Sequence, residues 1–415
     1  MLKLIAYLTI LIAFASSAIA RPQYSILQSY GIKCTGCHIS INGGAARNAQ
    51  GNIARNAISL IPTDKVPVLG TIFDKISNNN SFFDDKVMWG MDFRYLSARF
   101  PTPDSNLTAM SRQQRFMQWS PYLIITPTDG LQFDGMYNIA TQIDPTFKGQ
   151  QSWTATATLN LNKMIDYDNW LPMLRIGKFQ PGIGIRWDDH TVLSRWVNGT
   201  KAQVRGKNGE DYYTKMPLYP PDDYAEYGAE LSFDKYDWLQ LAFGAFKSTN
   251  LLHMPPAFNK NYSPDTLGKD SISFTGKMLV ILPEWHGISS FVGGTFLKNG
   301  ELILSDAFLS FGMRDKFVVI AEFSYSDKKD LMHTQAYLLE ADYQFKDYFI
   351  PFARIERSQS REIVAPAPYY RNLYNFGAHL NLLPFIELIP QYQISRYEHI
   401  SGYASQWLLQ LHVFY

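Results

Sequence analysis

The sequence predicts an all-β fold, namely a transmembrane antiparallel β-barrel of about 16 strands, with a small N-terminal segment that acts as a plug in its lumen. Aromatic residues make up 15% of the chain, whereas charged residues make up only 18%, below the usual quarter or so. After the N-terminus no run reaches the roughly 18 apolar residues that a membrane-spanning helix needs. Bacterial barrels instead carry aromatic girdles and an apolar band outside, with polar residues inside.

The first 20 residues have the pattern of a secretory signal peptide. Lys3 supplies the positive start, residues 4–15 are apolar, and Ala18-Ile19-Ala20 is a small-x-small cleavage site. An uncleaved membrane anchor is the alternative, but the apolar stretch is short and wrongly flanked for one. We therefore expect residues 1–20 to be removed and the mature chain to be exported.

The next feature is the run Cys34-Thr35-Gly36-Cys37-His38, which contains the two cysteines of the chain. Cys-x-x-Cys-His is the attachment signature of c-type haem. Each thiol, from Cys34 and Cys37, can add to one haem vinyl group, and His38 can reach the iron as proximal ligand. A local disulfide, a dithiol redox motif and half of a zinc site are the alternatives. Zinc would need more ligands, and a thioredoxin-like motif would need a βαβ unit. The run therefore predicts one covalently bound haem c.

The haem segment, residues 21–60, is too small to form an independent core. Residues 61–85 contain Pro62, Pro67 and Gly70, so they are expected to be a linker into the first barrel strand. We therefore expect the barrel, residues 86–415, to shelter the haem segment.

The haem segment also lacks a second iron ligand, because no His or Met follows His38 before Met88. Electron-transfer haems of this type commonly use His and Met, or two histidines. Three possibilities follow: the barrel donates the sixth ligand, the iron is five-coordinate, or a weaker ligand binds.

Two barrel histidines are candidates for this distal position. His190 is the first, because it ends the Gly- and Pro-interrupted stretch 181–190, which could fold into the pore, and Asp188 or Asp189 could orient its ring. His379 is the second. On the strand parity described next, Met136, His379 and His412 face the lumen and Met278 faces lipid.

The barrel strands are predicted from period-two alternation, as in residues 131–140 and 374–382. Short turns such as Pro127–Gly130 alternate with longer polar loops. The last strand is apolar and ends on the aromatic Tyr415, so it resembles the C-terminal strand of outer-membrane barrels. The longer loops are expected at 143–150, 197–222, 249–270 and 358–370.

Charge excludes one class of partner. The chain has 38 basic and 37 acidic residues, and loss of Lys3 with the signal peptide would make them equal. A nucleic-acid-binding protein would favour a basic patch, so no nucleic acid is expected as a partner.

Together, the signal peptide, one Cys-x-x-Cys-His and a barrel ending on an aromatic residue resemble the fused porin–cytochromes of bacterial outer membranes. The chain is similar to the single-haem cytochrome–porins of iron-oxidising bacteria, whose haem motif is preceded by a pattern that Pro22-Gln23-Tyr24 and Gly31-Ile32-Lys33-Cys34 match in part. This resemblance implies an electron-transfer protein in contact with outer-membrane lipid, with periplasmic electron carriers on one side and an extracellular redox partner on the other. A porin gated by a haem plug and a peroxidase-like haem enzyme remain alternatives.

Overall fold

A computed structural model of the chain describes residues 33–41, 43, 46–48, 50–51, 60–61, 65, 67–68, 71–72, 75, 80–101, 110–140, 150–165, 171–185, 192, 202–205, 211–214, 225–234, 238–248, 272–300, 302–314, 316–328, 332–362, 369–397 and 402–415. Within this part, 16 strands form one closed antiparallel barrel, as the sequence predicted.

The barrel strands are long and follow one another in chain order. They are β2 (Val87–Pro101), β3 (Met110–Thr128), β4 (Leu131–Ala140), β5 (Gln150–Asn160), β6 (Met173–Phe179), β9 (Glu226–Phe233), β10 (Leu239–Lys247), β11 (Ile272–Trp285), β12 (Ile288–Asn299), β13 (Leu302–Met313), β14 (Phe317–Lys328), β15 (Met332–Tyr343), β16 (Phe349–Glu362), β17 (Tyr369–Leu383), β18 (Ile386–Tyr397) and β19 (Ala404–Phe414).

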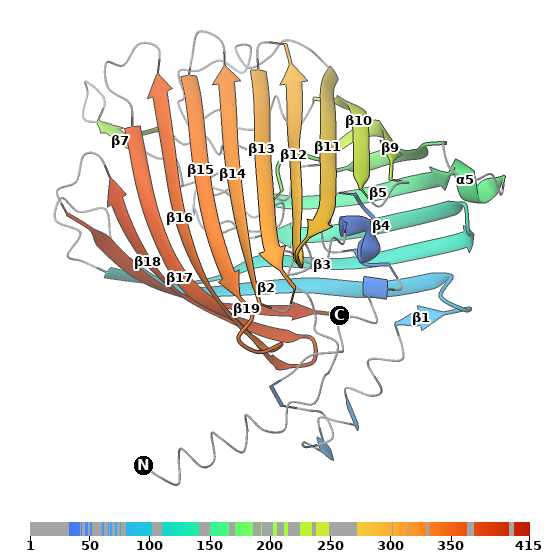
Figure 1. Cartoon of the computed structure of the whole chain (residues 1–415), viewed down its shortest axis with the longest axis horizontal. Coiled ribbons are helices and arrows are strands. Elements are labelled where there is room, and N and C mark those ends of the chain that lie inside the picture. The colour runs from blue at the N-terminus through green and yellow to red at the C-terminus, as the bar shows by residue number, and fades with distance from the viewer. Residues whose placement is uncertain are drawn as a thin grey trace.

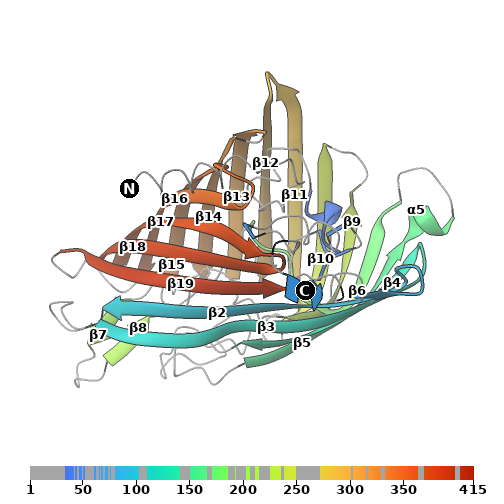
Figure 2. The same ribbon diagram turned by 90° about the horizontal axis from the view of Figure 1, so that it is seen from below.

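The barrel closes where the last strand pairs with the first. β19 runs antiparallel to β2, from Trp407 opposite Arg99 to Phe414 opposite Asp92. β6 pairs directly with β9, so the chain between them leaves the barrel wall and returns. Figure 1 shows β11–β16 side by side as one wall, and Figure 2 shows β19 beside β2 at the seam. Closure gives every barrel strand two neighbours, so no backbone edge is left unpaired.

Five short elements of the described residues lie outside the barrel ring. β1 (Ser81–Phe82) adds to β2, η1 (Cys34–Gly36) is a 3-10 turn, and α5 (Leu161–Met164) follows β5. β7 (Ala202–Arg205) pairs with β8 (Asp211–Thr214) in a separate hairpin, so the expected loop 197–222 contains regular structure. Among the described residues, no helix is long and apolar enough to cross a membrane.

Side chains alternate between two chemically different faces. In β4, Phe133 is 44% exposed on the outer face, whereas Asp134 is 8% exposed on the inner face. In β17 the same contrast holds between Phe376 and the buried Asn375. The predicted parity of β19 is also confirmed, with Trp407 and Leu409 outside and Gln406, Leu408, Gln410, His412 and Phe414 inside. An apolar outer face around a polar lumen is the arrangement that a lipid bilayer requires.

Tight turns mark one end of the barrel. β11 and β12 are joined by His286 and Gly287, whose φ angles of 49° and 77° are both positive, as a two-residue type I′ hairpin needs. The turn at Asp129–Gly130 lies at the same end. The chain ends there too, where the Tyr415 N–H donates to the Met91 carbonyl at 2.7 Å. Short turns face the periplasm in such barrels, so we call this the periplasmic mouth.

Candidate functional site

The Cys-x-x-Cys-His run folds as a single tight turn. The N–H groups of Cys37 and His38 both donate to the carbonyl of Cys34, at 3.1 and 2.8 Å. Residues three and four positions apart in such a turn lie on one face. Both cysteines are half-buried free thiols, so the local disulfide considered from the sequence is not formed. Two thiols and one imidazole presented together are the donor set of a c-type haem.

The chain folds back at residues 47–51 and holds this turn in place. The side chain of Asn48 donates from Nδ2 to the Thr35 carbonyl at 2.9 Å, and its backbone N–H donates to the Cys37 carbonyl at 3.0 Å. Its Oδ1 accepts from the N–H of Gly51 at 2.9 Å. A Cβ on Gly51 would lie 2.1 Å from the Cys37 oxygen, so no side chain fits there. His38 also forms a β-bridge with Arg47, which holds the returning chain close to His38.

One side of the haem segment is fastened to β9 and β11. Asp234, just after β9, binds Lys33 at 2.5 Å and accepts from the Thr35 hydroxyl. Its side chain is only 6% exposed, so this carboxylate is satisfied by the plug rather than by water. Lys277 of β11 reaches into the lumen and donates from Nζ to the Ile41 carbonyl at 2.9 Å. Two charged side chains of the barrel therefore hold the turn. Asp234 binds its start, at Lys33 and Thr35, and Lys277 binds the chain just after it, at Ile41.

The opposite side of the segment packs on β2–β4 and β19. Ile39 and Ala46 lie against the buried cluster of Met88, Tyr122 and Ile124, which Met136 also joins. In addition, the Arg47 guanidinium lies 5.4 Å from the centre of the Phe414 ring. Figures 1 and 2 both show the blue residues of this segment inside the barrel, close to β10. The described part of the haem segment therefore lies inside the periplasmic mouth and touches the wall on several sides.

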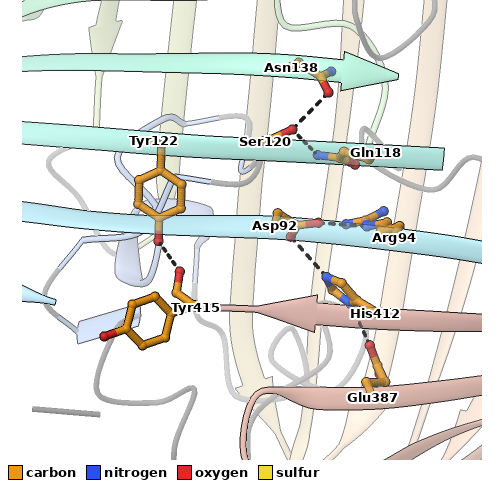
Figure 3. Close-up of polar contacts among 9 residues, drawn as sticks. All are labelled: Asp92, Arg94, Gln118, Ser120, Tyr122, Asn138, Glu387, His412 and Tyr415. Carbon is orange, nitrogen blue, oxygen red and sulfur yellow. Dashed lines mark hydrogen bonds and ion pairs between the residues drawn. The ribbon is translucent and has the colours of Figure 1, made fainter. Parts of the chain in front are cut away.

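A chain of buried polar groups continues along the wall from this mouth. Glu387 of β18 bonds Nδ1 of His379 at 2.9 Å and Nδ1 of His412 at 2.8 Å. Nε2 of His412 lies 3.0 Å from Asp92, which in turn pairs with Arg94 at 3.1 Å. Figure 3 shows the part of this chain from Glu387 through His412 and Asp92 to Arg94, which crosses β18, β19 and β2 near the Tyr122–Tyr415 contact. The network spans the closure seam of the barrel.

The structure tests several of the predicted ligand positions. Met136, His379 and His412 point inward and Met278 points outward, as strand parity predicted. His190, the first distal candidate, lies outside the described residues. Within the described ranges, no group of three or more His, Cys, Asp and Glu side chains is arranged to hold a metal ion.

The start of the chain between β6 and β9 folds into the lumen, as the interrupted stretch 181–190 suggested. The Gly184 N–H donates to the Thr295 hydroxyl at 2.7 Å, and the Ile185 N–H donates to Glu322 at 3.2 Å. Gly184 has a φ of 74°, which suits glycine. Ile185 packs on a cluster of Leu279, Phe291 and Phe308. Residues 181–185 therefore line the inside of the wall rather than a solvent loop.

Sequence reasoning missed the residues that seat the motif. In the sequence, Asp234 lies in the turn-forming run Phe233-Asp234-Lys235, and neither it nor Asn48 or Lys277 carries a pattern that points to the motif. Asp234 and Thr35 are 199 residues apart in the sequence, and only folding brings them together.

Comparison with solved structures decides the fold. OprB of Pseudomonas putida at high pH matches with a TM-score of 0.52 and 10% identity, over 80% of this chain and 95% of that one. OmpF of Salmonella typhi, in complex with daunomycin, matches with a TM-score of 0.52 and 10% identity, over 80% and 99%. An anion-selective porin from Comamonas acidovorans has a TM-score of 0.51 and 8% identity, over 79% and 99%.

The chain has the fold of a bacterial outer-membrane porin. No known family profile and no curated protein matches the sequence, so the likeness is one of architecture alone. That fold and the apolar outer face of the barrel place the chain in the bacterial outer membrane.

Proposed function

We propose that this porin-like barrel is an outer-membrane cytochrome that carries electrons between an extracellular donor or acceptor and periplasmic carriers through one haem c. The observation that supports this most is the Cys-x-x-Cys-His turn itself, held inside the periplasmic mouth by Asp234 and Lys277. A free-standing cytochrome would need its own core, whereas this segment uses the barrel wall as its core.

Different residues of the chain would attach the haem, ligate its iron and enclose it. Each thiol, of Cys34 and Cys37, would add across one vinyl group of a haem: the S–H bond and the vinyl π bond break, a C–S and a C–H bond form, and no oxidant is needed. The imidazole of His38 would supply the proximal nitrogen ligand. A bound haem would supply a one-electron Fe(III)/Fe(II) couple, whose potential depends on axial ligand, burial and hydrogen bonds. The barrel contributes a polar interior through an apolar band about 25 Å tall, which otherwise separates donor from acceptor.

The deciding experiment places the purified full-length holoprotein in liposomes. The vesicles enclose an oxidised, membrane-impermeant dye, and an impermeant reductant is added outside. We expect the enclosed dye to be reduced by the wild-type protein and not by the Cys34→Ala/Cys37→Ala double variant. A second trapped solute that is redox-inert reports leakage through the lumen.

Each result decides between the proposal and its rivals. Equal dye reduction by both proteins, with matching leakage, would identify a passive porin and overturn the proposal. Leakage that changes with the redox state of the protein would instead favour a haem-gated pore. Failure of the wild type to reduce the dye, together with peroxide turnover, would favour a peroxidase-like enzyme.

A further inference from the structure

We propose that His379 supplies the sixth iron ligand through Nε2, and that Glu387 is the positioning residue that aims it. This inference rests on the proposed haem attachment and deepens it by naming the wall residue that completes the coordination. The hydrogen bonds of His379 and His412 differ. Both ring nitrogens of His412 have a carboxylate partner, whereas only Nδ1 of His379 has one.

The lone pair of each histidine follows from its partners. An ionised carboxylate only accepts hydrogen bonds, so a ring nitrogen bound to one must carry a proton. Both ring nitrogens of His412 contact carboxylates, Glu387 at 2.8 Å and Asp92 at 3.0 Å, so His412 has no lone pair to offer. His379 uses only Nδ1, which bonds Glu387 at 2.9 Å. Its Nε2 makes no hydrogen bond to any residue that the structure describes.

This is the arrangement that metal-bound histidines use. Such a histidine almost always donates its other ring N–H to a carboxylate or carbonyl, which fixes the tautomer and raises the basicity of the ligating nitrogen. Glu387 is itself 2% exposed and is held in place by His412, so its carboxylate cannot swing away from His379 without leaving a buried ion pair. The His379 side chain is 20% exposed, so it is still open to the lumen.

The position of His379 also suits the role. The N–H of Leu60, from the end of the haem segment, donates to the Asn381 carbonyl at 2.8 Å, two residues beyond His379 on β17. From the other direction, His38 bridges to Arg47 and Arg47 covers Phe414. The Phe414 ring lies 5.1 Å from that of His412, which shares Glu387 with His379. The segment that carries the proximal histidine therefore touches the network that carries the distal one.

The other described histidines do not fit. His286 sits in a tight turn, stacked edge-on against the exposed Trp285. His333 lies at the far end of β15, bonded to Asp327 at 2.9 Å. Among the described methionines, Met88 and Met136 pack in the apolar cluster beside Ile39, and Met117 is buried in a second apolar cluster with Leu96, Ala98 and Leu408. These methionine side chains lie in apolar clusters, whereas Glu387 bonds Nδ1 of His379 at 2.9 Å and so orients its ring, and we assign the ligand to the histidine.

The test begins with the full-length protein and two separate readouts. Covalent haem, seen as haem staining that survives denaturing electrophoresis, checks the proposed attachment and does not depend on the sixth ligand. The electron paramagnetic resonance and near-infrared spectra of the ferric protein then report the axial ligands. We expect low-spin iron with two nitrogen ligands in the wild type. His379→Ala should retain covalent haem but lose this low-spin signal completely, and added imidazole should restore it.

Further variants separate ligation from structure. His379→Met should give the near-infrared band of a sulfur-bound ferric haem and a higher reduction potential. Glu387→Gln should stay low-spin with a raised potential, because an amide accepts less strongly than a carboxylate and the ligand becomes less basic. His333→Ala is the matched control and should leave the spectra unchanged. A low-spin spectrum that survives in His379→Ala, or a methionine signature in the wild type, would overturn the assignment. Loss of covalent haem in the wild type would instead refute the proposed function.

Discussion

At the scale of single residues, Gly51, the glycine behind the haem motif, lies in a position that has no room for a side chain. A methyl group on Gly51 would lie 2.1 Å from the Cys37 carbonyl, and that carbonyl already accepts from Asn48. We predict that Gly51→Ala displaces the turn, at a cost of about 1–3 kcal/mol for an overpacked site. The haem-to-protein ratio should therefore fall.

A matched glycine in the barrel wall serves as the control for that change. Gly135→Ala meets nothing closer than 3.7 Å and should load haem normally. Full haem loading in Gly51→Ala, with an unchanged spectrum, would contradict the seating of the motif described above.

A second residue-scale prediction concerns the carboxylate that fastens the plug. Asp234→Ala leaves Lys33, whose side chain is 12% exposed, without that partner. Losing one member of a buried pair typically costs about 3–5 kcal/mol, so the segment should dock more weakly. Limited proteolysis of the folded barrel should then cut within residues 33–48 faster than in the wild type. Asp347→Asn, in another periplasmic turn where Asp347 accepts from Gln344, should not change the cutting rate.

The haem is a prediction from the sequence alone, whereas the contacts that hold its motif are visible only in the structure. Cys34, Cys37 and His38 lie within five residues, so their spacing is enough to predict a haem. The groups that hold them come from distant strands, and a single sequence carries no record of which strand faces which loop. Asn48 is a different case, because its role depends on a local return of the chain that turn propensities do not specify.

At the scale of strands, the two faces of the barrel make opposite demands on charge. Leu409 lies midway along β19 and is 44% exposed on the outer face. We predict that Leu409→Lys destabilises the barrel by about 2–4 kcal/mol, the cost of a cation at the membrane midplane. Leu282, 43% exposed near the periplasmic end of β11, is the depth control, and Leu282→Lys should cost about 0–1 kcal/mol. Chemical denaturation in lipid vesicles measures both.

If both leucine variants lost the same stability, the depth assignment would be wrong. If neither lost any, the outer face would not be facing lipid. Either outcome would require a different orientation of the barrel.

The sequence was enough to predict which side chains face outward and which face the lumen. Lipid outside and a polar lumen inside require apolar and polar residues to alternate along each strand, as in β4, β17 and β19. The hairpin of β7 and β8 was not readable, since its two short strands lie in a polar stretch without that alternation. Leu302 and Leu304 illustrate a further limit. Both are buried on the inner face of β13, so an apolar side chain does not by itself mark the outer face of a strand.

At the scale of the whole molecule, the plug makes the barrel asymmetric from end to end. The haem motif lies at the periplasmic mouth, where Asp234, Lys277 and Phe414 hold its segment. A protein electron carrier too large to enter the lumen should therefore reduce the haem from the periplasmic face and not from the extracellular face. Stopped-flow reduction of oriented proteoliposomes tests this, and a small permeant reductant should react from both sides. Equal rates for the large carrier from either face would contradict the placement.

The seam between β2 and β19 has one more consequence, for the order of events during biogenesis. Ile39 rests on Met88 of the first barrel strand, while Arg47 rests on Phe414 of the last. These two strands meet only when the ring closes, so the seat of the motif is complete only after the last residues of the chain have been placed. A chain that stops short of β19 would thus keep the contacts to Met88 and Asp234 but lack the one to Phe414, so the segment reaches its full set of wall contacts only when the ring is sealed.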